Sequence, residues 1–228
     1  MTKFYKTLAI VLIVKEWRES DLLFSFYTRE YGKVRAIAAG SRKIKSKLAG
    51  HLAGPGVIEL VFVKGKAFNR ITHAHSVGKR FLRGERDINY LSCVLEIIEQ
   101  AVPEESPNGK IWNLLAWALE NILPKEIGPQ RPSTAANDHL RKFIVNIFIL
   151  KLLPIIGYGI KIGNESGHLP VSLKEMNPQN LELIKKIQAD AQMNALNISK
   201  ENNDELTTFL KKYLEYMLEK KINSLVMI

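Results

Sequence analysis

The segment that decides the fold is LLFSFYTREYGKVRAIAA, residues 22–39. Its first half alternates, with Leu22, Phe24 and Phe26 on one face, and the Tyr31-Gly32 turn leads into a second apolar stretch. Short apolar segments of the same kind recur on both sides of it, separated by turn residues. The sequence therefore predicts five strands: Thr7–Lys15, Leu22–Thr28, Lys33–Ala39, Val57–Val63 and Phe68–His75. Five such strands favour a small all-β barrel or sandwich, with one long irregular connection at Gly40–Gly56.

Beyond residue 85 apolar residues recur at every third or fourth position, which predicts helices. These helices are expected at about residues 88–98, 111–122, 138–156, 181–195 and 206–218. Asn137 or Asp138 is the expected N-cap of the third helix. Gly157–Pro178 is expected to be a loop because it holds four glycines and two prolines. The prediction is a two-part α+β protein, with a β domain at residues 1–82 and an all-α domain at residues 83–228.

The net charge of +10 is unevenly distributed over the 228 residues. Residues 1–84 hold 17 Lys and Arg against five Asp and Glu, whereas the remainder holds 16 against 18. Such a field indicates a polyanionic partner for the first part, either nucleic acid or an anionic membrane surface. The single cysteine, Cys93, permits neither an internal disulfide nor a cysteine-built zinc site. With no stretch typical of a secretion signal or a membrane span, the expected location is the cytoplasm.

The strongest chemical feature is the loop GSRKIKSKLAG at residues 40–50. A run of cations like this one can follow a phosphate backbone, because each neutralised phosphate releases counterions. More cations lie on neighbouring strands and turns. The predicted nucleic-acid-binding residues are Lys33, Arg35, Arg42, Lys43, Lys45, Lys47, Lys64, Lys66 and Arg70. Tyr27, Tyr31 and Phe68, near strand ends, are candidates for base stacking.

Signals for catalysis or metal binding are poor. Lys64-Gly65-Lys66 lacks the flanking residues of a phosphate-binding P-loop. His73 and His75 could point the same way from one strand, but no acid or cysteine beside them completes a metal site. We therefore expect no enzymatic activity, no cofactor and no metal. In the helical part, Arg141 and Lys142 lie in the first turns of a predicted helix and are a candidate site for a partner's carboxylate.

Four segments resemble, in order and spacing, the N-terminal domain of RecO, a family of bacterial mediators of DNA repair and recombination. They are Ala9–Leu12, Glu19–Leu23, Tyr27–Val34 and Ala39–Leu48. Three later segments resemble the central helix of the family, the turn after it and the closing helix. These are Leu140–Phe143, Leu152–Gly159, and Phe209–Leu218 with Ser224 close behind.

The resemblance implies a five-stranded OB-fold barrel followed by a helical domain. It also implies a protein that binds single- and double-stranded DNA, anneals complementary strands and works with RecR to load RecA onto SSB-coated DNA. Arg141, beside Lys142, matches a basic residue that helps to hold the acidic C-terminal tail of SSB. Many members carry a four-cysteine zinc site after the turn at Gly157-Tyr158, but residues 157–178 contain no cysteine. No zinc finger is therefore expected.

Three other interpretations stay open on the residues alone. An OB-fold that binds structured RNA fits the charge distribution equally well. A phosphoryl-transfer enzyme such as a nuclease would need clustered acids for Mg²⁺, and residues 1–84 offer only Glu16, Glu19, Asp21, Glu30 and Glu59. Membrane-surface binding is disfavoured, because the cations lie on a predicted barrel and not on an amphipathic helix. The favoured reading is a non-enzymatic, nucleoid-associated DNA-repair mediator.

Overall fold

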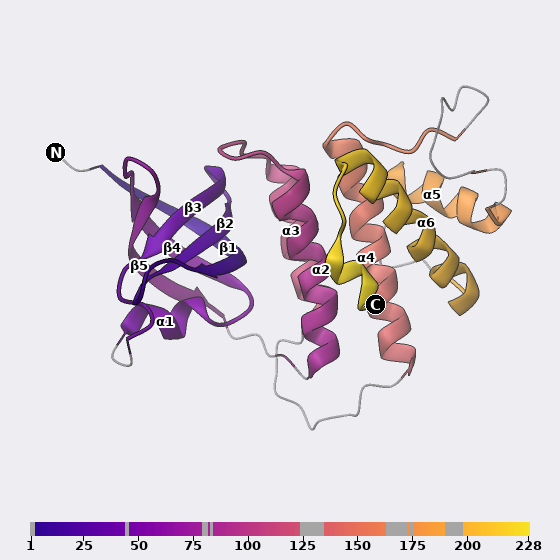
Figure 1. The fold of residues 1–228 in the computed structure, drawn as a ribbon. Coiled ribbons are helices and arrows are strands. Elements are labelled where there is room, and N and C mark those ends of the chain that lie inside the picture. Colours follow the sequence, from indigo (N-terminus) through magenta and orange to yellow (C-terminus); the bar gives the residue numbers. More distant parts are fainter. Residues whose placement is uncertain are drawn as a thin grey trace.

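The computed structural model describes residues 3–43, 46–78, 82, 84–123, 135–162, 173, 176–189 and 198–228, without the side chains of Lys47 and residues 135–137. Its first part is a closed barrel with the strand order β1-β2-β3-β5-β4 (Figure 1). The strands are β1 (Phe4–Glu16), β2 (Leu22–Thr28), β3 (Gly32–Ala38), β4 (Val57–Val63) and β5 (Asn69–Val77). All neighbours are antiparallel except β3 and β5, which run parallel. The predicted five-stranded OB-type barrel is confirmed, with every strand end within three residues of its expected place.

The long strand β1 closes the barrel because it serves two neighbours. Phe4–Ile10 pairs with β4, and Ala9–Glu16 pairs with β2. A register shift between Val11 and Ile13 bends the strand between these two ladders. The interior is filled by the alternating residues that the sequence indicated, among them Phe24, Phe26, Leu60 and Phe62.

The connection at Gly40–Gly56 is not wholly irregular, because it contains the helix α1 (Lys47–Leu52). Leu48 and Leu52, one helical turn apart, pack against the barrel core. The Ser76 hydroxyl of β5 donates a hydrogen bond to the His51 carbonyl at 3.2 Å. A helix of six residues shows too few apolar positions for its period to be recognised in the sequence.

The second part consists of helices, as predicted. They are α2 (Glu85–Ala101), α3 (Gly109–Ile122), α4 (Ala135–Ile155), α5 (Pro178–Gln188) and α6 (Lys200–Leu218), followed by a short 3₁₀ helix at Asn223–Val226. In Figure 1 the barrel lies at one end of the molecule, α5 and α6 lie at the other, and α2, α3 and α4 lie between. None of the described helices is both long enough and apolar enough to cross a lipid bilayer.

Several helix ends differ from expectation for local reasons. The helix α4 begins at Ala135, so neither Asn137 nor Asp138 is its N-cap. The helix α5 begins at Pro178 because the Asn177 side chain caps it by accepting a hydrogen bond from the Gln179 amide. It ends at Gln188, before the expected residue 195. The predicted boundary between residues 82 and 83 stays a prediction, since residues 79–81 and 83 lie outside the described residues.

The barrel is joined to the helices through the outer face of β1, β2 and β3. Ile10, Leu12 and Tyr27 belong to the same hydrophobic core as α2, α3 and α4. The connection between α2 and α3 continues the contact, because the Glu105 amide donates to the Lys33 carbonyl at 2.9 Å. Gly32 has φ +68°, and a Cβ there would come within 2.5 Å of the Ser106 backbone. Only glycine allows the two parts to approach so closely.

Candidate nucleic-acid interface

Three loops of the barrel contact one another. The Trp17 ring, after β1, meets the edge of the Phe68 ring, before β5, at a centroid distance of 5.0 Å. The Arg42 amide, after β3, donates to the Ser20 carbonyl at 3.1 Å. The Gly40 amide donates to Asp21 Oδ1 at 2.8 Å. We call the region formed by residues 17–21, 39–43 and 64–70 the loop face.

The loop face carries cations that are open to phosphate. Lys43, Lys64, Lys66 and Arg70 are exposed. Among the described residues, no carboxylate oxygen lies within 4.0 Å of these four. Arg42 pairs with Glu16 at 3.2 Å, and both side chains are more than 40% exposed. An ion pair of this kind contributes about 1 kcal/mol or less, so a phosphate can replace the carboxylate.

A groove of about 480 Å³ runs between the β4–β5 turn and β3. Lys64 and Lys66 lie on one side of it, and Arg35 with Glu104 and Glu105 on the other. The turn is tight at Gly65, where a Cβ would come within 2.1 Å of the Phe68 carbonyl oxygen. Gly65 therefore fixes the two lysines at the edge of the groove.

Two residues of β3 that were predicted to bind nucleic acid, Lys33 and Arg35, form contacts between the barrel and the helices. Lys33 is only 5% exposed, and its ammonium donates to the Glu99 carbonyl at 2.6 Å. Burial lowers the pKa of Lys33, against the opposing effect of the Glu99 and Glu104 carboxylates. Arg35 contacts Glu104 at 2.9 Å and Glu99 at 3.8 Å. Lys33 therefore cannot reach a phosphate, while Arg35, at 44% exposed, stays at the rim of the groove.

The other residues predicted to bind nucleic acid are either outside the described residues, buried or half-buried. Lys45 and the side chain of Lys47 lie outside the described residues. Tyr27 is fully buried, and its hydroxyl shares a 3.2 Å contact with the Asn108 carbonyl, so it cannot stack on a base. Phe68 and Tyr31 are half-buried at the barrel surface. Trp17 was not predicted from the sequence as a candidate for base stacking, because a lone aromatic residue in a loop belongs to no recognisable pattern.

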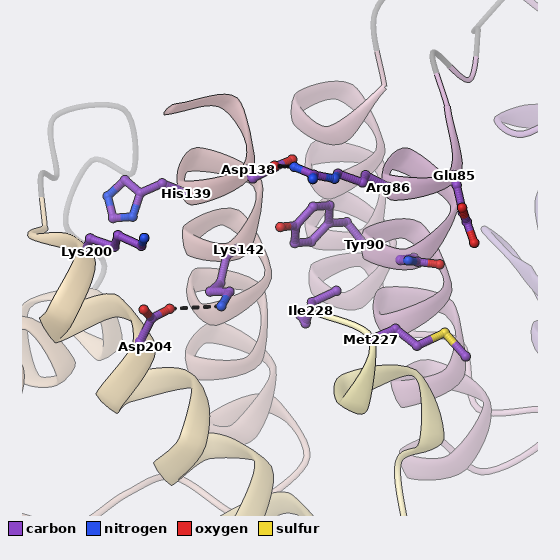
Figure 2. A pocket seen from close by; sticks show the side chains of 11 residues that line it. Glu85, Arg86, Tyr90, Asp138, His139, Lys142, Lys200, Asp204, Met227 and Ile228 are labelled. Atoms are coloured by element: carbon purple, nitrogen blue, oxygen red, sulfur yellow. Dashed lines mark hydrogen bonds and ion pairs between the residues drawn. The ribbon is translucent and has the colours of Figure 1, made fainter. Parts of the chain in front are cut away.

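A second candidate site lies in the helical part (Figure 2). A cavity of about 530 Å³ is bounded by α2, α4, α6 and the last residues of the chain. Lys142 and Lys200 line it together with His139, and Lys142 pairs with Asp204 at 2.9 Å. Tyr90, Met227 and Ile228 supply apolar surface.

Arg141, predicted with Lys142 to bind a partner's carboxylate, does not line this cavity, whereas Lys142 does. Arg141 is 11% exposed and contacts the buried Asp87 carboxylate at 2.7 Å. One residue further along α4, Lys142 faces the cavity, because successive helical positions point about 100° apart. Arg141 still lies close behind the wall. Burial raises the pKa of Tyr90, and the charges of Arg141 and Arg86 oppose that shift.

Residues 1–80 match the family model described as "Recombination protein O N terminal". The barrel is therefore similar to the N-terminal domain of RecO. The chain is 35% identical to the DNA repair protein RecO of Nostoc sp., over 55% of this chain and 44% of that protein. It is 24% identical to the DNA repair protein RecO of Pelotomaculum thermopropionicum, over 97% of this chain and 92% of that protein.

The match to the RecO of Trichodesmium erythraeum is 33% identical over 54% of this chain and 43% of that protein. The chain thus aligns with less than half the length of the Nostoc and Trichodesmium proteins. The RecO resemblance is confirmed most firmly for the barrel, which carries the loop face. For the helical part, the resemblance is supported by the match to the Pelotomaculum protein, which covers 97% of this chain.

The single cysteine of this chain lies in the helical part. This residue, Cys93, is buried in α2 and lies far along the chain from residues 157–178. Burial raises the pKa of the Cys93 thiol to about 12, so the thiol is protonated at neutral pH. Among the described residues, no group of three or more His, Cys, Asp or Glu side chains could hold a metal ion.

Proposed function

We propose that this chain acts in DNA repair and recombination by binding DNA on the loop face of its barrel. The observation that carries the proposal is a set of exposed cations, Lys43, Lys64, Lys66 and Arg70, that lie on an OB-type barrel and pair with no carboxylate of the part of the chain that the structure describes. The loops after β1 and β4 are the parts of this fold that bind oligonucleotides in other proteins. The relatives named DNA repair protein RecO support the same role.

Strand annealing follows from this surface without a catalytic residue. Two complementary strands repel one another through their phosphates, and a cationic surface that screens both lets them meet. We propose that the chain anneals strands in this way and that, with RecR, it helps to load RecA onto SSB-coated DNA. Its place of action would then be the nucleoid, in the cytoplasm.

The helical cavity supports a second, separate contact, with the acidic C-terminal tail of SSB. Lys142 and Lys200 offer cations to a terminal carboxylate, and Tyr90 and Met227 offer apolar surface to a hydrophobic side chain. We infer that Lys142 and Lys200 make the direct contact and that Arg141 adds positive charge from behind. Lys200→Ala is then expected to weaken binding of a tail peptide while DNA affinity is kept. Equal peptide binding by both proteins would contradict this assignment.

Charge reversal tests the DNA-binding proposal. The variant Lys64→Glu, Lys66→Glu, Arg70→Glu is expected to lose most affinity for a short single-stranded oligonucleotide and most annealing activity. The matched control is Lys161→Glu, Lys185→Glu, Lys212→Glu, which changes the net charge equally but on exposed positions of the helical part. Equal affinity in the two triple variants would move the DNA site away from the loop face. Competition with RNA of the same length separates DNA binding from the RNA alternative.

A further inference from the structure

The barrel carries a small aromatic cavity next to the groove of the loop face. Its volume is about 200 Å³, and its walls include Tyr5, Tyr31, Val34 and Phe62. The Tyr5 and Phe62 rings are stacked at 5.3 Å, and the Tyr31 ring meets each of them edge-on, at 5.5 and 5.7 Å. Val34 and Phe62 are buried, whereas Tyr5 and Tyr31 remain partly open to solvent. The cavity is therefore a hydrophobic recess with aromatic sides, of a size for one planar group.

The cavity and the groove adjoin one another. Lys64 and Asn69 line both, as do Val34 and Glu105. A strand whose phosphates follow Lys64 and Lys66 in the groove would therefore pass the mouth of the cavity.

The charges around the cavity favour a base inside it and phosphates outside it. The ammonium groups of Lys3 and Lys64 lie over the Tyr5 ring, 5.3 and 5.8 Å from its centroid. Both lysines are exposed, so their flexible side chains can move from the ring to a phosphate. Glu30 and Glu105 line the cavity itself. Their carboxylates repel a phosphate there but can accept hydrogen bonds from the N–H groups of a base.

We propose that this cavity binds one unstacked base of a DNA single strand. The proposal rests on the proposed function, since the loop face must first hold the backbone. Paired bases in a duplex are stacked on both sides, so they cannot enter the cavity without being flipped out. The cavity would thus give this protein a preference for single strands that the cations alone do not supply.

The test uses the full chain and two conservative variants, Tyr5→Leu and Tyr31→Leu. Each keeps an apolar side chain but removes an aromatic wall. Affinity for a short single strand is expected to fall about five- to tenfold, the effect of losing one base–aromatic contact. Affinity for a duplex of equal length and the salt dependence are expected to stay as in the wild type. Tyr216→Leu, an exposed tyrosine on α6, is the control and should change neither affinity.

A photocrosslink locates the base directly. Single strands that contain 5-iododeoxyuridine are expected to form adducts on peptides carrying Tyr5 or Tyr31 upon irradiation. Adducts confined to other peptides, or unchanged single-strand affinity in both variants, would overturn the base site. So would an equal loss of duplex affinity.

Two further outcomes distinguish this proposal from a failure of the proposed function and from a site for a protein side chain. If the wild type binds no oligonucleotide at low salt, the proposed function itself fails. If Tyr5→Leu keeps single-strand affinity but loses binding of an acidic peptide that ends in phenylalanine, the occupant is a protein side chain and the base site is wrong.

Discussion

At the scale of single residues, the structure separates cations that the sequence presents as equals. Lys33 and Lys66 both lie in the basic part of the chain, and each directly follows a glycine. Lys33 points outward from β3, but α2 covers that face, and its ammonium binds the Glu99 carbonyl. Because this covering comes from residues more than 60 positions away, no local pattern in the sequence could reveal it.

Replacing these two lysines by methionine should therefore give opposite results. Lys33→Met leaves the partly buried Glu99 carbonyl without its donor, which is expected to lower the free energy of unfolding by about 1–3 kcal/mol while DNA affinity is kept. Lys66→Met should weaken DNA binding and leave stability unchanged. Urea unfolding and oligonucleotide titration measure both quantities. Reduced DNA affinity in a stable Lys33→Met protein would place Lys33 in the DNA site after all.

Because Cys93 is buried, we expect the protein to lose unfolding free energy at alkaline pH. Burial raises the folded pKa of the Cys93 thiol to about 12 from an ordinary value of 9.0, so the stabilisation is complete below pH 9 and is lost progressively as the pH rises from 9 to 12. Between pH 8 and pH 10, wild type should lose about 1.4 kcal/mol more unfolding free energy than Cys93→Ala. Buried tyrosines such as Tyr27 are present in both proteins and cancel in the difference. Parallel pH curves from urea unfolding would contradict this account.

At the scale of elements, strands were better predicted than helix ends. The alternation in β2 and β4 is a direct result of one face lying in the barrel core, so the sequence shows it. Two features depend on contacts that are distant in the chain. The helix α1 is held by the barrel core, and Tyr27 is buried by the helices, so it is not available for stacking. The cations of the β4–β5 turn, Lys64 and Lys66, are exposed, because turns almost always lie at the surface, and their binding of DNA stays a prediction.

The β4–β5 turn provides the clearest test at this scale. Gly65→Ala would bring a Cβ to within 2.1 Å of the Phe68 carbonyl oxygen, so the turn must open. We expect a loss of about 1–3 kcal/mol of stability, as for other overpacked sites, and weaker DNA binding because Lys64 and Lys66 move. Gly54→Ala, where no atom lies within 4 Å of the added Cβ, should change neither. Thermal unfolding and DNA titration distinguish the two variants.

At the scale of the whole molecule, the barrel and the helices share one packed junction. Ile10, Leu12 and Tyr27 leave the barrel to join the helical core, and Glu99 of α2 accepts hydrogen bonds from Ser25 and Lys33. The charge asymmetry of the sequence pointed to two parts with separate tasks, but it carries no information about how they dock. A fragment of residues 1–84 is therefore expected to expose apolar surface and to unfold at a lower temperature than the full chain.

Our central claim is that the exposed cations of the loop face bind DNA phosphates, and its salt dependence tests that claim most directly. If about five phosphates are neutralised, the logarithm of the single-strand association constant should fall with the logarithm of salt concentration with a slope of about −3.5. In the variant Lys64→Glu, Lys66→Glu, Arg70→Glu the slope should become shallower by about 2 or more, whereas the control triple variant of the helical part should keep it. A slope near zero in the wild type, or the same slope in all three proteins, would contradict the account.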